Sequence, residues 1–172
     1  AFDEFFKSAA KLNGLVRLSK GMTTTAIGQL KKFAMTKAAD AAMKDNIKEL
    51  VGDKPESEWT TEESIAVMKM AKGQGKISAD ETRYFLTTAG SMGITVISLG
   101  KGIKEAGDLL PKGAGLMKDI ATWKSNPAKM IKAKGALDGV KGSVDNLKDV
   151  VNNAPKLLEE LNVLLSAFKS LS

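Results

Sequence analysis

Apolar residues recur at helical spacing through the first fifty residues of the chain. One apolar stripe begins at Phe2, and a second ends near Leu50. Gly21 lies between the two stripes, and Gly52 precedes a turn at residues 53–55. We therefore expect two amphipathic helices here, separated by a break near Gly21.

The next two helix starts carry more specific signals. Thr60 and Glu63 have the spacing of a capping box, in which a hydroxyl and a carboxylate each accept a hydrogen bond from a backbone N–H group. Ser78 and Glu81 repeat this spacing. Residues 73–75 read Gly-Gln-Gly and predict the end of the helix between the two boxes.

The segment Tyr84–Gly100 is the most apolar in the chain. It holds 17 residues without a charge, but five of them are Ser or Thr and three are Gly. A membrane span needs about 20 predominantly apolar residues. The pattern favours a helix buried on all sides at the centre of a bundle, and membrane insertion is the alternative.

Glycine and proline are dense between Gly100 and Gly115, which predicts a hinge or linker. A short helix should follow over residues 116–123 and end at residues 125–127. The sequence thus divides into a helical bundle (1–110), a connection with a short helix (111–126) and C-terminal amphipathic helices (127–172).

The C-terminal part has the most regular pattern. From Met130 to Phe168, apolar residues alternate spacings of three and four, as in a coiled-coil heptad. Three glycines weaken the early part of this pattern, and Pro155 predicts either two helices or one helix bent near residues 152–155. The side chains expected to bind a partner lie on this apolar face: Leu137, Val144, Leu147, Val151, Leu158, Leu161, Leu165 and Phe168.

Composition narrows the possible chemistry. The chain has no cysteine and no histidine, so it lacks thiolate nucleophiles, disulfides, and the commonest general base and metal ligand. The net charge is +6, and residues 82–137 hold nine basic and three acidic residues. Almost all the basic residues are lysine, which disfavours sequence-specific nucleic-acid recognition but allows attraction to an anionic surface. The chain begins at Ala1 rather than at a methionine, and we interpret this as favouring an exported (periplasmic or secreted) protein.

No motif predicts catalysis or metal binding. Residues 70–81 place a glycine and a glutamate as a calcium-binding loop does, but Met70, Lys72 and Gln74 occupy the ligand positions. The paired acids of the chain are adjacent in sequence and point in different directions on a helix, so they do not form an acid–base dyad. We therefore expect a protein that is not an enzyme and has no cofactor.

One segment combines an aromatic side chain with a lysine cluster. Trp123 is followed by Lys124, Lys129, Lys132 and Lys134. A half-buried tryptophan at a solvated basic edge is the simpler interpretation, and a helix that lies on a membrane interface is the close alternative.

These patterns predict an all-α fold, a bundle of six to eight helices around the Tyr84–Gly100 helix with a long or kinked C-terminal amphipathic pair. The first functional hypothesis is a non-enzymatic interaction protein that binds a protein partner, or itself, through its C-terminal helices. The alternative is a membrane-active protein that binds a lipid or another apolar ligand, with Trp123 and the four lysines after it as contact residues.

Overall fold

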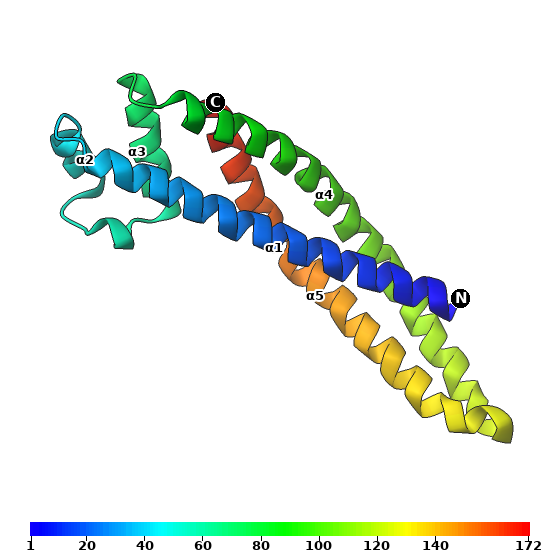
Figure 1. Cartoon of the computed structure of the whole chain (residues 1–172). Helices are drawn as coiled ribbons and strands as arrows, with labels where there is room; N and C mark the ends of the chain where they lie inside the picture. The colour runs from blue at the N-terminus through cyan, green and yellow to red at the C-terminus, as the bar shows by residue number, and fades with distance from the viewer. The chain divides into compact units, whose positions relative to one another are not determined.

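The computed structural model describes all residues, 1–172, and its regular elements are all helical (Figure 1). The elements are α1 (Phe2–Ala38), α2 (Lys44–Val51), the 3-10 helix η1 (Glu56–Glu58), α3 (Thr61–Gly73), α4 (Ala79–Thr122), the 3-10 helix η2 (Trp123–Ser125) and α5 (Pro127–Leu171). The all-α prediction is confirmed. The chain forms five α-helices rather than six to eight, because α1, α4 and α5 each continue through a position where a break was predicted.

The predicted break at Gly21 is wrong, since α1 is one helix of 37 residues. A glycine inside a helix costs about 1 kcal/mol relative to alanine. Thr23, Ala26 and Leu30, just beyond Gly21, are buried, and this burial offsets the local cost. The chain breaks instead after Ala38, and α2 then ends at Gly52, which adopts a positive φ of 69°.

Both predicted capping boxes are confirmed. The backbone N–H of Glu63 donates to Thr60 Oγ1 (3.1 Å), and the backbone N–H of Thr60 donates to Glu63 Oε1 (3.0 Å). The same reciprocal pair joins Ser78 and Glu81, at 3.1 and 3.0 Å. These boxes define the starts of α3 and α4.

The predicted hinge at Gly100–Gly115 is also wrong, because the whole segment is helical within α4. Two of its glycines lie where other helices approach closely. A Cβ atom added at Gly102 would come within 2.9 Å of the side chain of Leu15, and one at Gly113 would come within 2.5 Å of Val144. The glycines therefore permit close helix packing here rather than chain flexibility.

In the same way α5 continues as one helix through Pro155, so of the two predicted alternatives, two helices or one bent helix, the structure has a single helix. Pro155 is exposed, while Ala154 and Leu157 on either side of it are buried. Burial of these flanking side chains offsets the helical hydrogen bond that proline cannot donate.

Contacts between residues divide the chain into two compact units. Unit 1 consists of residues 1–20 and 95–159, and unit 2 consists of residues 21–94 and 160–172. Helices α1, α4 and α5 each contribute one segment to each unit. The sequence-based division differs, because its first boundary, at residue 110, falls inside α4.

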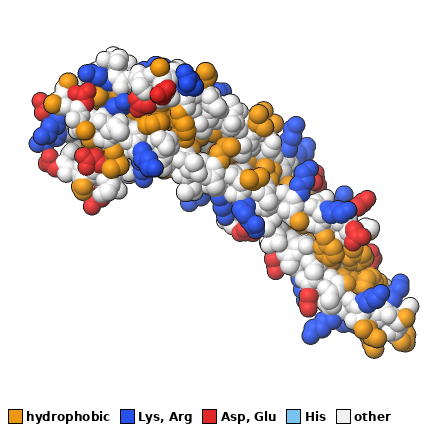
Figure 2. Space-filling view, in the orientation of Figure 1, with side chains coloured by type: hydrophobic (Ala, Val, Ile, Leu, Met, Phe, Trp, Pro, Cys, Tyr) orange, Lys and Arg blue, Asp and Glu red, His pale blue; other side chains and the backbone are white.

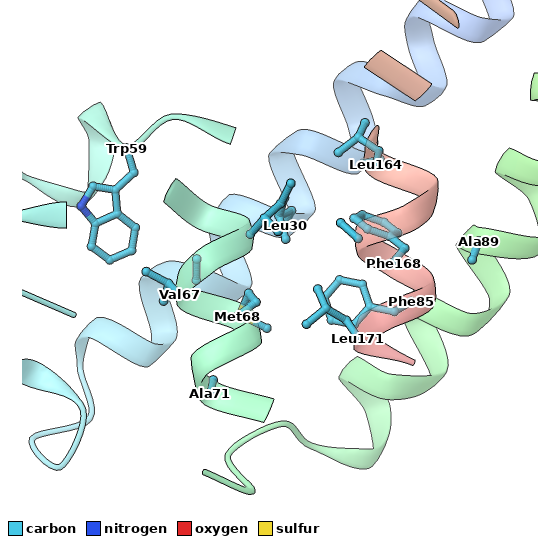
Figure 3. Packing of buried hydrophobic residues seen from close by; sticks show 14 of the residues in the cluster. Leu30, Trp59, Val67, Met68, Ala71, Phe85, Ala89, Leu164, Phe168 and Leu171 are labelled. Carbon is cyan, nitrogen blue, oxygen red and sulfur yellow. The ribbon is translucent and has the colours of Figure 1, made fainter. Parts of the chain in front are cut away.

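Unit 2 has a core with aromatic side chains at its centre (Figure 3). The ring of Phe85 from α4 meets that of Phe168 from α5 edge-on, with centroids 4.9 Å apart. Phe33 from α1 packs against Phe85 at 5.5 Å, also edge-on. Leu30 and Met68 extend the core toward α3, as Figure 3 shows.

Unit 1 is built from the first half of α1, the second half of α4 and most of α5. Its buried side chains come from all three segments: Phe5, Ala9, Leu12, Val16, Leu99, Ala106, Leu109, Leu116, Ile120, Val140, Val144, Leu147, Val150, Ala154 and Leu157. Each segment thus directs one apolar face inward and leaves lysines on the outside.

The apolar segment Tyr84–Gly100 is not buried on all sides, contrary to the first interpretation. Leu86, Ile94 and Ile97 are exposed. Its buried side chains lie on the other face of α4: Phe85, Ala89, Met92 and Leu99. None of the helices combines the length and the hydropathy that crossing a membrane requires.

Candidate functional site

The connection between α4 and α5, here called the α4–α5 turn (residues 117–137), carries the residues that the membrane hypothesis singles out. The 3-10 helix η2 follows α4 directly, and α5 starts at Pro127. Asn126 Oδ1 accepts a hydrogen bond from the backbone N–H of Ala128 (3.1 Å) and so caps α5. Proline is favoured at the first helical position because its missing N–H has no partner there anyway. Local sequence therefore explains why the chain reverses here.

Trp123 lies at the centre of the turn and is half-buried. Its ring packs against Phe2 at the start of α1, with centroids 5.6 Å apart. The Lys129 Nζ atom lies 5.8 Å from the centroid of the Trp123 ring, within the range of a cation–π interaction. These contacts place one lysine of the cluster directly beside the aromatic ring.

A groove of about 340 Å³ lies within the turn, between the end of α4 and the start of α5. Residues of α4 line one side and residues of α5 the other: Met117, Ile120 and Ala121, with Lys124 of η2 beyond them, and Met130, Ala133, Lys134 and Leu137. All the lining side chains are apolar except the two lysines. The arrangement therefore offers an apolar slot with positive charge at its edge.

Two large apolar side chains near the groove are unusually exposed. Ile131 exposes 87% of its surface and Met130 exposes 56%. Figure 2 shows hydrophobic and basic side chains intermixed where α4 turns into α5. Met130 and Ile131 together leave adjacent apolar surface exposed beside lysines, and such surface is a candidate for an external contact.

The charge between Asp119 and Asp138 is uniformly positive. Lys124, Lys129, Lys132 and Lys134 all lie in the stretch between Asp119 and Asp138, which contains no acidic residue. None of the four lysines forms an ion pair. Their positive charge is therefore available to an anionic ligand or surface.

The residues predicted to bind a partner lie on α5, mostly in contact with the chain's own helices. Val144, Leu147, Leu161 and Phe168 are buried. Leu137, Val151, Leu158 and Leu165 are half-buried. The first five residues of the predicted set lie in unit 1 and the last three in unit 2, so the structure does not bring them together in one site.

A different buried polar group lies in unit 2. The ammonium group of Lys37 at the end of α1 donates to Glu81 Oε1 at 2.7 Å, and the two side chains are only 12% and 10% exposed. Burial acts to raise the pKa of the Glu81 carboxyl. The hydrogen bonds from Lys37 and from the Ser78 backbone N–H outweigh this effect, so the pKa is lowered. The pair links α1 to the capping box of α4, which is a structural role.

No group of three or more aspartates, glutamates, histidines or cysteines is placed to hold a metal ion. The chain matches no known protein-family model, no curated protein and no solved structure. The candidate function must therefore be argued from the geometry of the α4–α5 turn.

Sequence reasoning identified Trp123 and the four lysines that follow it, at positions 124, 129, 132 and 134, but missed Ile131. The available signal was its position, because Ile131 falls outside the three-four apolar pattern of α5 and has lysines on both sides in sequence. An apolar residue that does not belong to the core-facing stripe of its helix is a candidate for an external contact.

Proposed function

We propose that this protein attaches reversibly to anionic membrane surfaces through the α4–α5 turn. The observation that carries the proposal is the nearly complete exposure of Ile131 in the midst of four unpaired lysines. Peripheral membrane segments combine these two features, an apolar side chain that enters the boundary of the acyl chains and basic residues that stay at the headgroups.

The expected energies are those of a reversible interaction. Each lysine close to an anionic membrane contributes about 1 kcal/mol, so Lys124, Lys129, Lys132 and Lys134 together contribute about 4 kcal/mol. Burial of a large apolar side chain such as Ile131 or Met130 adds about 1.5–3 kcal/mol. Neither contribution is large by itself, and both are needed for stable attachment.

Association with a protein through the apolar face of α5 has less support. Leu147, Leu161 and Phe168 are already covered by the chain's own helices. Using this face for a partner would require the packing of α5 to open, which would expose the cores of both units. The proposal is therefore of a membrane-binding protein, with no catalytic step.

Co-sedimentation with lipid vesicles tests the proposal. We expect the protein to pellet at low salt with vesicles of equal parts phosphatidylcholine and phosphatidylglycerol, and to remain in the supernatant with phosphatidylcholine alone. Raising the salt concentration to about 1 M shortens the screening length to about 3 Å and should release most of the protein. Failure to pellet with anionic vesicles at low salt would refute the proposal.

A further inference from the structure

The groove in the α4–α5 turn has a regular construction. One side consists of positions 117, 120 and 121 of α4 and 124 of η2, and the other side of positions 130, 133, 134 and 137 of α5. Both sets follow the spacing i, i+3, i+4, i+7, which places each set on one face of a helix over two turns. At about 1.5 Å of rise per residue, the groove is a straight slot about 10 Å long between two facing helix stripes.

The lining determines what the slot can accept. Six of its eight side chains are apolar and the other two are Lys124 and Lys134. A hydrocarbon chain fits the apolar walls, and an anionic head fits the two ammonium groups. At about 340 Å³, the groove is near the lower end of the roughly 300–1,000 Å³ typical of small-molecule sites.

We propose that this groove binds the alkyl chain of a single-chain amphiphile with an anionic head, such as a fatty acid. Lys124 lies on the side of the groove nearest the connection to α5, while Met117 and Leu137 lie at the opposite end. The anionic head therefore contacts Lys124, and the chain extends past Lys134, which is three residues from Leu137, toward Met117 and Leu137. This inference rests on the proposed function, because the same turn would present the groove to a membrane.

Calorimetric titration with a series of saturated fatty acids tests the inference, each used below the concentration at which it forms micelles. Burial of each additional methylene group should raise the affinity about fourfold until the groove is full, after which the affinity should level off. The alkylamine of matching chain length should bind at least tenfold more weakly, because its head repels the lysines. Equal affinity for the amine and the acid, or no dependence on chain length, would overturn the inference.

Two substitutions that fill the groove provide the structural control. Ala133→Leu and Ala121→Leu each place a larger side chain in the slot, and each should lower the affinity for decanoate at least tenfold. Ala114→Leu makes the same change at an exposed position of α4 outside the groove and should leave the affinity unchanged. The second groove variant keeps the test decisive if thermal melting shows that one of the two is misfolded. Unchanged decanoate binding by a folded groove variant counts against the inference.

The two proposals can fail separately. Ile131 does not line the groove, so Ile131→Ser should weaken vesicle binding about thirtyfold and leave decanoate binding intact. Decanoate binding by a protein that ignores anionic vesicles would support the groove and refute membrane attachment. Vesicle binding that survives in the groove variants, without any measurable decanoate binding in the native protein, would refute the groove alone.

Discussion

Replacement of Ile131 by serine is the most direct test of how the α4–α5 turn acts. The side chain exposes 87% of its surface in the free protein, so its removal costs the fold little. Surface substitutions of this kind change stability by less than about 0.5 kcal/mol. Any loss of membrane binding can then be assigned to the membrane-bound state rather than to unfolding.

The expected magnitude follows from the area that the membrane would cover. Complete burial of an isoleucine is worth about 1.5–3 kcal/mol, and nearly all of the Ile131 surface is available for burial. Taking about 2 kcal/mol for insertion at the interface, Ile131→Ser should lower the membrane partition coefficient about thirtyfold. The lysines are unchanged, so the salt dependence of the remaining binding should be the same.

The assay is a titration with vesicles that contain phosphatidylglycerol, with bound protein measured by sedimentation. Ile94→Ser is the matched control, because Ile94 is 70% exposed and lies in an uncharged segment of α4 far in sequence from the lysine cluster. We expect this control to change the partition coefficient less than about twofold, within the small effects of surface substitutions. If both variants bind equally well, the exposed apolar side chain of the turn does not contribute and the membrane proposal is wrong.

Three further predictions concern charge, packing and pH. Lys132→Gln should weaken vesicle binding about fivefold at low salt, because it removes about 1 kcal/mol of binding free energy. Lys69→Gln, on the exposed face of α3, should have no effect in the same titration. Gly113→Ala should lower the free energy of unfolding, measured in urea, by about 1–2 kcal/mol, because the added Cβ would meet the stiff side chain of Val144. Gly115→Ala is the control, since the space around its Cβ is open, and it should be neutral or stabilising by up to about 1 kcal/mol. Equal effects of the two substitutions would contradict the close approach at Gly113. Glu81→Gln should cost about 2–4 kcal/mol at pH 7 by breaking a buried ion pair. The pKa of Glu81 is lowered in the folded protein from its ordinary value of 4.5. The charged carboxylate therefore contributes fully to folding stability above about pH 4.5, and this contribution is lost as the pH falls through the folded-state pKa. The difference in stability between the native protein and Glu81→Gln should shrink between about pH 6 and pH 3. A stability difference that stays constant between about pH 6 and pH 3 would show that the charge of Glu81 does not stabilise the fold.

The candidate site could be predicted only in part. The lysine cluster and Trp123 are visible as composition along one short segment. The groove is not, because it depends on the end of α4 and the start of α5 lying side by side, which brings together residues as far apart in sequence as Met117 and Leu137. The exposure of Ile131 is likewise a result of which face of α5 turns inward.

The apolar face of α5 shows how many of the buried residues of a helix a periodic sequence pattern can predict. The pattern correctly indicated burial at Val140, Val144, Leu147, Ala154, Leu161 and Phe168. It missed Val150, Leu157 and Leu164, which are more buried than the adjacent predicted residues at 151, 158 and 165, and it ended before the buried Leu171. A three-four rhythm defines a narrow stripe, whereas a helix packed against more than one neighbour buries a wider face.

The sequence alone determined the features that arise within a few residues of one another. These are the all-α class, the two capping boxes and the turn at residues 125–127. Tertiary structure decided what the glycines and prolines do, because their effect depends on their neighbours. Gly52 ends a helix at a position that requires a positive φ. Gly113 instead lies within a helix, where Phe5 and Val144 from two other helices occupy the space that a side chain would fill. The local cost of such a residue is about 1 kcal/mol, so the packing of distant segments is enough to determine whether the helix continues.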